Sequence, residues 1–390
     1  MDDDSSRGNE DGVGEWVWPA YVGILGGIGL FAVLTVPIVV IQYRRYGRFT
    51  WRRFLGAAAA GIYATALVAY TLLPLPDPAA MFCSPGGSTA QLVPFNFLAD
   101  IRRETTGMGT VAAASSRVVL QVAFNVVLFI PWGIFVRRYL DRGIMAATLT
   151  GLLASVAIET TQFTGLWGIY DCAYRVADID DVMTNTLGAL LGAIVAPAVL
   201  WFMPRQRELQ AARSVARPVT VARRWVGMIV DFALLGFIGS VLAIAARLIA
   251  RLFWNADTLP SWVEATLSYG VPALVVFYLP ALFGAGGSLG QRAVWLAPSW
   301  ARPSLLLRLW RASVVGGLYL ALQVLAQGTG AKMTGLATML GGLLLAANFL
   351  MVLFGKERRG LSGVLSGARM VDSRSSRAGT SREGITTGKA

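Results

Sequence analysis

Long apolar runs separated by short polar connections form the pattern of this chain. Each run has about twenty residues and few charges, which is enough to cross ~30 Å of hydrocarbon as an α-helix. The pattern predicts nine membrane-spanning helices, at residues 18–43, 54–73, 118–136, 144–163, 182–203, 226–250, 269–283, 309–327 and 334–354. The seventh run is the shortest and contains Pro272 and Pro280. The predicted fold class is therefore an all-α, polytopic membrane helix bundle.

Composition and charge agree with this class and predict its orientation. Charged residues are only 14% of the chain, whereas a soluble domain carries roughly 25%. Alternate connections hold 26 of the 34 lysines and arginines, and the positive-inside rule assigns those connections to the cytoplasm. The N-terminus is then outside and the C-terminus inside. The net charge of +12 is therefore read as a signal of topology, and no nucleic-acid partner is predicted.

Changes in composition predict the domain organisation. A polar, basic stretch with Pro218 near its end reads as a cytoplasmic linker between two membrane domains. The C-terminal end is rich in Ser, Thr, Gly and Arg, which favours disorder. The predicted parts are an acidic extracytoplasmic tail at 1–17, a five-helix membrane domain at 18–204, the linker at 205–220, a second membrane domain of about four helices at 221–372, and a disordered cytoplasmic tail at 373–390.

Polar residues gather at the outer ends of the fourth and fifth spans. Glu159 and Gln162 are three residues apart and share one face of the fourth span. Polar groups at the edge of lipid are costly unless they have partners, water or a task. The candidates for a ligand or ion site are Asn125, Glu159, Gln162, Arg175, Asp178, Asp180, Asp181 and Asn185. A bundle of the third, fourth and fifth spans would bring them together in one external pocket.

The fifth span carries a stripe that passes from polar to small residues. Asp181, Asn185, Gly188 and Gly192 follow one face of a helix, and the two glycines form a small-xxx-small pattern that admits a second helix. A purely architectural reading is also open, because acidic residues at a helix start suit its N-cap and the positive end of its dipole. Arg175 is then either their counter-charge or a side chain that reaches the interface.

The residue inventory limits the chemistry. The chain has no His, which removes imidazole bases and most zinc sites, and no phosphate-binding loop is present. Mg²⁺ or Ca²⁺ at Asp178, Asp180 and Asp181 remains an option, as does an acid/base pair of Glu159 and Asp181. The sequence requires no cofactor and favours a non-enzymatic role. The two cysteines, Cys83 and Cys172, lie in predicted outer loops, where they either pair as a disulfide or stay free.

Several motifs in the first domain resemble the VanZ-like family over residues 55–204. Trp132 replaces the commoner Phe of the family's Pro-Phe-Gly motif. The segments that carry the resemblance are Leu72-Leu73-Pro74, Val93-Pro94-Phe95-Asn96, Phe124-Asn125 through Pro131-Trp132-Gly133, Glu159-x-x-Gln162, and Arg175-x-x-Asp178-x-Asp180-Asp181-x-x-x-Asn185-Thr-Leu-Gly188. The family's founding member is associated with resistance to the glycopeptide teicoplanin. The resemblance therefore implies a role in the bacterial cell envelope and a plasma-membrane location.

The second domain resembles the RDD family over residues 221–372. Asp231 follows Arg224 by seven residues, so it lies two turns along the same face and ~10 Å into the inner leaflet. Both are site candidates, and a structural pair between them is the alternative. Residues 286–292 resemble the family's Gly-x-x-Leu-Gly-Lys-Arg loop, and 359–371 its closing motif, in which Gly363 stands where the family has Asp. The resemblance implies transport, including ion exchange.

Three functions follow from these observations. The first is an envelope protein whose outward-facing polar pocket binds or shields an envelope lipid, a wall precursor or a glycopeptide antibiotic. The second is a secondary transporter or ion exchanger that uses Asp231 and the outer carboxylates, although no inverted repeat is visible. The third is a membrane-embedded enzyme that acts on lipid or wall precursor. We expect the first, with the lipid bilayer and these envelope molecules as partners.

Overall fold

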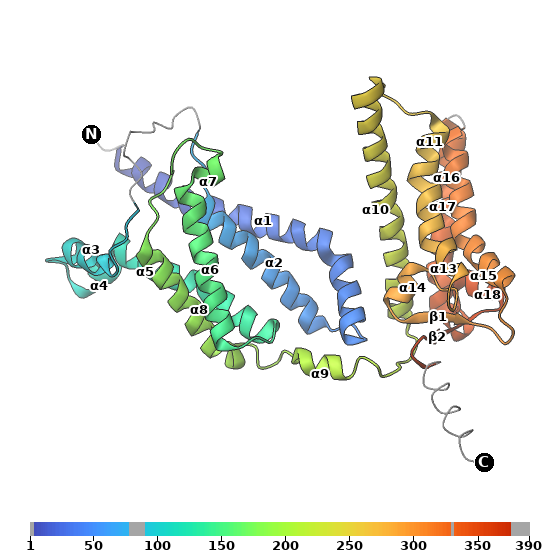
Figure 1. Cartoon of the computed structure of the whole chain (residues 1–390), viewed down its shortest axis with the longest axis horizontal. Helices are drawn as coiled ribbons and strands as arrows, with labels where there is room; N and C mark the ends of the chain where they lie inside the picture. Colours follow the sequence, from blue (N-terminus) through green and yellow to red (C-terminus); the bar gives the residue numbers. More distant parts are fainter. Residues whose placement is uncertain (1–3, 78–89, 329–330, 376–390) are drawn as a thin grey trace, which may run out of the picture. The chain divides into compact units, whose positions relative to one another are not determined.

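α-Helices make up most of the protein (Figure 1). The structure, a computed structural model, describes residues 4–77, 90–328 and 331–375. In these ranges nine helical segments are long and apolar enough to cross a membrane: Trp18–Tyr46, Trp51–Leu72, Arg117–Tyr139, Ile144–Phe163, Ile179–Val199, Val221–Trp254, Ser261–Leu282, Leu305–Ala326 and Thr334–Phe354. The predicted class of all-α polytopic membrane protein is confirmed, and each predicted span corresponds to one of these segments.

The seventh span begins eight residues before its predicted start. It runs over Ser261–Leu282 and includes π-helical turns at Thr266–Gly270 and Leu274–Tyr278. The prediction was too short because Glu264 interrupts the apolar run. In the structure Glu264 is paired with Arg247 of the preceding helix, so that the helix can carry this charge.

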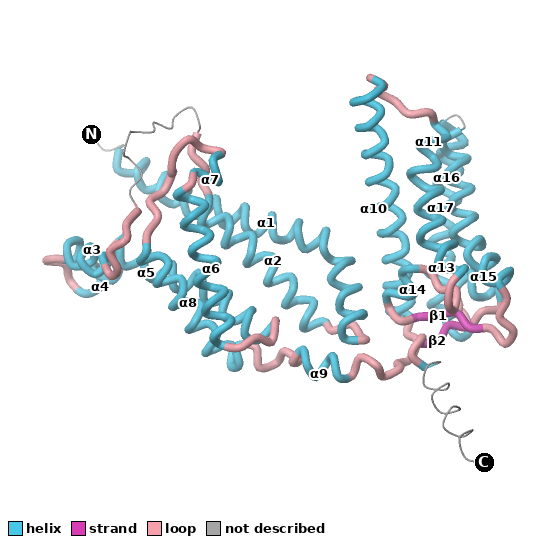
Figure 2. The backbone as a smooth tube through the Cα atoms, viewed as in Figure 1, coloured by secondary structure: helices cyan, strands magenta, loops and turns pink. Residues whose placement is uncertain are grey.

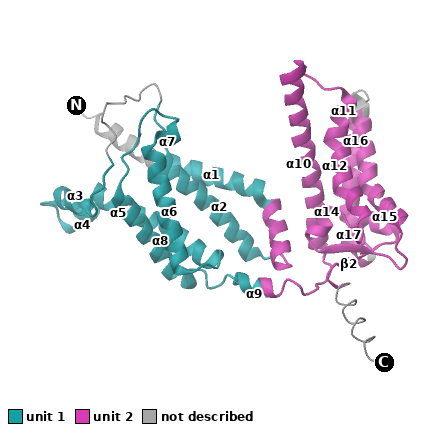
Figure 3. Cartoon of the chain, in the orientation of Figure 1, with its two compact units in different colours: residues 1–35, 50–209 teal, residues 36–49, 210–390 magenta. Residues whose placement is uncertain are grey.

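The chain divides into two compact units, one comprising residues 1–35 and 50–209, the other 36–49 and 210–390 (Figure 3). The division after Leu209 falls inside the predicted linker 205–220, where the short helix α9 (Gln206–Ala211) lies. Helix α1 (Asp4–Tyr46) already begins within the predicted acidic tail. Residues 376–390 of the predicted C-terminal tail lie outside the described residues.

The first unit is a bundle whose centre is the pair α5 and α8. One core cluster of this bundle consists of Leu67 of α2, Phe129 of α5 and Ala189 of α8, with Ile158 of α6 packed against them. The helices of this unit after α1 are α2 (Trp51–Leu72), α3 (Asn96–Thr105), α4 (Thr110–Ala114), α5 (Arg117–Ile134), α6 (Ile144–Phe163), α7 (Gly165–Gly168) and α8 (Ile179–Val199).

Glycines allow α5 and α8 to touch along their backbones. A Cβ atom added at Gly188 would lie 2.1 Å from the carbonyl oxygen of Val126, and one at Gly192 would lie 2.0 Å from that of Ile130. From the other helix, a Cβ at Gly133 would lie 2.0 Å from the oxygen of Ala189. Only glycine fits such contacts. The predicted close approach at Gly188 and Gly192 is confirmed, with α5 as the partner.

The second unit combines helices with a small sheet. Its elements are α10 (Val221–Trp254), α11 (Ser261–Ala265), α12 (Val271–Ala273), α13 (Leu279–Leu282), α14 (Leu289–Ala293), β1 (Leu296–Ser299), α15 (Leu305–Ala312), α16 (Leu318–Gly328), α17 (Ala331–Phe354), α18 (Gly360–Ser366) and β2 (Arg369–Asp372). Figure 2 shows the two strands in magenta. They pair antiparallel, with Leu296 opposite Asp372. The all-α prediction did not include this two-stranded sheet, because four-residue strands leave little periodic signal.

A buried ion network ties β2 to the start of α10. The carboxylate of Asp372 lies 2.9 Å from Arg223 and 2.6 Å from Arg374, and all three side chains are buried. Burial by itself would raise the pKa of Asp372, but hydrogen bonds from Arg374 and from the backbone N–H of Arg217, with the charge of Arg223, hold that pKa well below its usual range. The network therefore joins the ends of distant segments.

The α5–α8 contact gives a direct test of the bundle. We expect Gly192→Ala to lower the free energy of unfolding by ~1–3 kcal/mol, because the new methyl group would displace the backbone of α5. Gly61→Ala in α2 is the matched control, since a Cβ there meets nothing within 4 Å and alanine favours a helix by about 0.5–1 kcal/mol. Thermal unfolding in detergent micelles measures both. Equal stability of the two variants would contradict the packing.

Candidate functional site

The start of α8 is fastened to the end of α6. Asp178 is the N-cap of α8, and its Oδ1 accepts a hydrogen bond of 2.8 Å from the backbone N–H of Asp180. The backbone N–H of Asp178 in turn donates to Oε2 of Glu159 at 3.0 Å. The capping interpretation is thus confirmed for Asp178, and Glu159 acts as an acceptor for this helix start.

Asp180 holds the segment that leads into α3. Its two carboxylate oxygens accept hydrogen bonds from the backbone N–H groups of Phe95, at 2.6 Å, and Phe97, at 2.8 Å. Phe95 has a φ of 65°, in the left-handed region, so the chain turns sharply there. Asp180 itself is buried. This carboxylate therefore positions α3 beside α8.

Two amide side chains link α8 to its neighbours. Asn125 of α5 donates from Nδ2 to Oδ1 of Asp181 at 2.6 Å. One turn further along α8, Asn185 donates from Nδ2 to Oγ of Ser155 in α6 at 2.9 Å, while its Oδ1 is buried without a hydrogen-bond partner among the described residues. The predicted stripe of Asp181 and Asn185 thus faces both adjacent helices.

Gln162 and Arg175 belong to a different contact. Gln162 donates to the carbonyl oxygen of Thr71 at 2.6 Å, and Arg175 donates to those of Thr71, at 3.4 Å, and Leu73, at 3.1 Å. They therefore satisfy the last carbonyl groups of α2. Arg175 forms no salt bridge within the described ranges, but its charge acts on the carboxylates of Glu159 and Asp181, so its role as a counter-charge stays a prediction.

A cavity of about 290 Å³ lies where α3, α5 and α8 meet. Its acidic lining includes Asp178, Asp180 and Asp181, as expected from the sequence. The complete lining is Phe97, Asp100, Arg103, Glu104, Val118, Gln121, Val122, Asp178, Asp180, Asp181 and Thr184. Glu159, Gln162 and Asn185 are close in sequence to these residues but do not line the cavity.

The sequence did not lead us to predict that α3 forms one wall of this cavity. Asp100 and Glu104 are one helical turn apart and sit directly after the Val93–Asn96 motif, which was the available signal. Asp100 accepts one hydrogen bond from Nδ2 of Asn96 at 3.1 Å and pairs with exposed Arg103 at 3.3 Å. Only the fold brings α3 against α8, through the hydrogen bonds to Asp180 described above.

The cavity is strongly acidic, because five carboxylate residues and a single arginine line it. The pKa of Asp178 is raised, first by burial and then by the like charges of Asp180 and Asp100, although the hydrogen bond from the N–H of Asp180 acts the other way. Such a surface attracts ammonium groups and accepts hydrogen bonds from hydroxyl groups.

The remaining predictions for the first unit concern a metal ion and a disulfide. In the part of the chain that the structure describes, no three acidic, His or Cys side chains are grouped so that they could hold a metal ion. Both oxygens of Asp180 already accept backbone hydrogen bonds, which argues against Mg²⁺ or Ca²⁺ there. Cys83 lies outside the described residues, so the disulfide with Cys172 stays a prediction.

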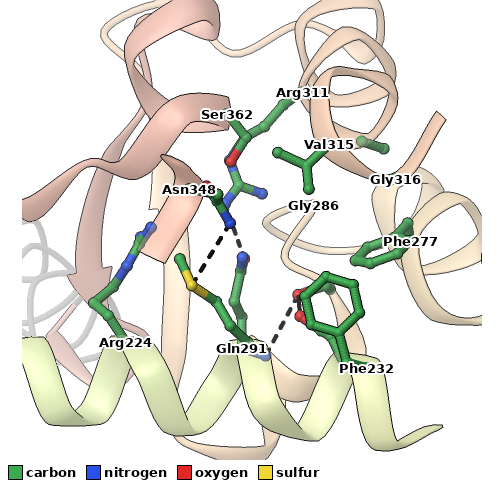
Figure 4. Close-up of a pocket in the computed structure, with 14 residues that line it drawn as sticks. Arg224, Phe232, Phe277, Gly286, Gln291, Arg311, Val315, Gly316, Asn348 and Ser362 are labelled. Atoms are coloured by element: carbon green, nitrogen blue, oxygen red, sulfur yellow. Dashed lines mark hydrogen bonds between the residues drawn. The ribbon is translucent and has the colours of Figure 1, made fainter. Parts of the chain in front are cut away.

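In the second unit, Asp231 is held by the glycine-containing loop that follows α13. Its carboxylate accepts hydrogen bonds from Oγ of Ser288 and from the N–H of Gly290, both at 2.6 Å. Arg224 donates instead to the carbonyl oxygen of Arg359 at 2.9 Å, and no salt bridge in the described ranges joins it to Asp231. Arg224 and Asp231 therefore do not form a direct structural pair, although their charges act on each other and both line one cavity, whose lining residues are drawn in Figure 4.

Comparison with protein families identifies the first unit. Helical spans and buried polar contacts define a multi-pass helical membrane protein. Residues 60–202 match the model of the family described as VanZ/LLP1, and the chain therefore contains a VanZ-type domain. The predicted resemblance to the VanZ-like family is confirmed over these residues. Neither the curated proteins nor the solved structures contain a match to the chain. The RDD resemblance of the second unit stays a prediction.

The raised pKa of Asp178 predicts a pH-dependent gain from Asp178→Asn. A raised pKa in the folded state means that folding favours the protonated acid, so ionisation at neutral pH opposes folding. Asparagine keeps the N-cap hydrogen bond and has no charge. We expect a higher Tm than wild type at pH 7.5, with the difference shrinking as the pH falls towards the ordinary pKa of aspartate. A difference that grows at low pH would contradict this assignment.

Proposed function

We propose that the cavity between α3, α5 and α8 binds a polar molecule of the bacterial cell envelope: a lipid head group, a wall precursor or a glycopeptide of the teicoplanin type. The observation that carries the proposal is the acidic lining, formed by Asp178, Asp180 and Asp181 on one side and by Asp100 and Glu104 on the other. This role follows the VanZ-type match of residues 60–202.

The lining combines the features expected of a binding site for sugars and amines. Carboxylates accept hydrogen bonds from hydroxyl and ammonium groups, while Phe97, Val118 and Val122 supply an apolar wall. At about 290 Å³ the cavity is large enough for one sugar ring or one amino-bearing group, but not for a whole glycopeptide. We infer that such a group enters while the rest of the ligand stays outside.

The residues divide by role. Both oxygens of Asp180 accept backbone N–H groups and one oxygen of Asp178 caps α8, so these two acids maintain the shape of the cavity. Asp181 has one oxygen engaged by Asn125, Glu104 has one engaged by the backbone N–H of Arg117, and Asp100 is bound by the side chains of Asn96 and exposed Arg103. Because all three acids are partly exposed, we assign the ligand contacts to them. The predicted orientation assigns this cavity to the outer face, where envelope molecules are found.

A binding titration with the full chain in nanodiscs tests the proposal. The probes are teicoplanin and a lipid-linked wall precursor, and nanodiscs of bilayer lipid alone set the baseline. We expect Asp181→Asn and Asp100→Asn each to weaken binding about tenfold, because each replaces a charge-assisted hydrogen bond by a neutral one. Cells that express these variants should lose protection against teicoplanin while the protein still inserts.

Glu208→Gln is the control, since Glu208 is an exposed acid of the same unit outside the cavity. It should bind and protect as wild type does. The proposal fails if the wild-type protein binds neither probe above the baseline and gives cells no protection. It also fails if the cavity variants and the control behave alike.

A further inference from the structure

Two buried arginines in the second unit line one cavity, and each has a guanidinium nitrogen without a hydrogen-bond partner among the described residues. Arg224 of α10 and Arg311 of α15 have exposed fractions of 2% and 5%. Nη1 of Arg224 and Nε of Arg311 have no hydrogen-bond partner among the described residues. Buried guanidinium N–H groups without partners are costly, so they point to an acceptor that is not part of this chain.

The hydrogen bonds that these arginines form do not neutralise their positive charge. Arg224 donates through Nη2 to the carbonyl oxygen of Arg359, and Arg311 donates through Nη2 to Oε1 of Gln291 at 3.1 Å and to the sulfur of Met370 at 3.6 Å. All three acceptors are neutral. The one acid in the lining, Asp231, accepts from Ser288 and Gly290 and forms no ion pair with either arginine in the described ranges. Two cations and one anion therefore share the cavity.

The cavity has the size and the lining for a small oxyanion. The cavity has a volume of about 40 Å³. Since one water needs ~10–15 Å³ of such volume, the cavity holds about three waters or one small anion. Asn348, Gln291 and Ser362 add neutral polar groups to the lining, and Figure 4 shows Arg224, Arg311 and Asn348 as parts of one site.

We propose that Arg224 and Arg311 bind a phosphate group in this cavity. Guanidinium groups suit phosphate because their planar N–H donors match its oxygens and keep their charge when buried. The phosphate comes from the solution or from an anionic lipid head group. Both arginines lie within the first seven residues of their spans, at the ends that the charge pattern assigns to the cytoplasmic interface. This site is separate from the acidic cavity of the VanZ-type domain.

The experiment uses the full chain in two kinds of nanodisc. In phosphatidylcholine discs, inorganic phosphate is titrated and the Tm is followed. In discs that contain phosphatidylglycerol, without added phosphate, native mass spectrometry detects retained anionic lipid. A saturable rise in Tm in the first arm identifies free phosphate, and retained phosphatidylglycerol in the second identifies the lipid. Either result supports the site. No saturable response in either arm would overturn it.

Variants separate this site from general attraction of anions to a basic surface. Arg224→Gln and Arg311→Gln should each weaken binding at least about tenfold. The matched control is Arg302→Gln, an exposed arginine that does not line the cavity, and it should bind as wild type does. Binding that is unchanged in both cavity variants, or weakened equally by the control, would overturn the proposal.

Asn348→Asp covers the case in which an arginine variant does not fold. Asn348 lines the same cavity, and its Oδ1 lies near Nη2 of Arg224. A Cβ placed on Gly360 would lie 3.3 Å from that Oδ1 and 2.9 Å from that Nη2. The substitution keeps the shape of the side chain and adds a tethered carboxylate. We expect a higher Tm without ligand and no further rise with phosphate. A phosphate response equal to that of wild type would count against the site.

Discussion

Polar groups that a membrane helix carries away from water need partners inside the protein, and the architecture depends on this constraint. Asp180 and Asp231 meet it in the same way, because each carboxylate accepts backbone N–H groups at the start of a short helix, α3 for Asp180 and α14 for Asp231. The first turns of α3 and α14 are thereby held against the long helices α8 and α10. In both units a buried acid fixes a loop that helps to form a cavity.

Close backbone packing makes these contacts possible. Gly188 and Gly192 let α8 meet α5 without side chains between them, and Gly290 lets the α14 loop meet α10, since a Cβ there would lie 2.0 Å from the carbonyl oxygen of Gly227. The α5–α8 contact sets the register in which Asn125 reaches Asp181. The site geometry of the VanZ-type domain therefore depends on residues with no side chain, through the distance between two helix axes.

The two cavities differ in charge, and this difference separates their chemistry. The cavity at α3, α5 and α8 is lined mainly by acids and suits ligands that donate hydrogen bonds, such as hydroxyl and ammonium groups. In the cavity around Arg224 and Arg311, the buried lining atoms without a hydrogen-bond partner among the described residues are guanidinium nitrogens, which is why we propose an oxyanion there. A single ligand group cannot match both linings, so the ligands that we propose for the two units differ in chemistry.

The sequence by itself determined the nine spans, the glycine stripe of α8 and the cap at Asp178, because hydrophobic length, helical period and N-capping are local properties. Tertiary structure alone decided that Asp180 holds the segment before α3, that Asp100 and Glu104 complete the acidic wall, and that Arg175 turns to the end of α2. Its long-range contacts also formed the sheet of β1 and β2. Each of these outcomes joins residues far apart in the chain, where the partner depends on which backbone groups remain unsatisfied once the helices have packed.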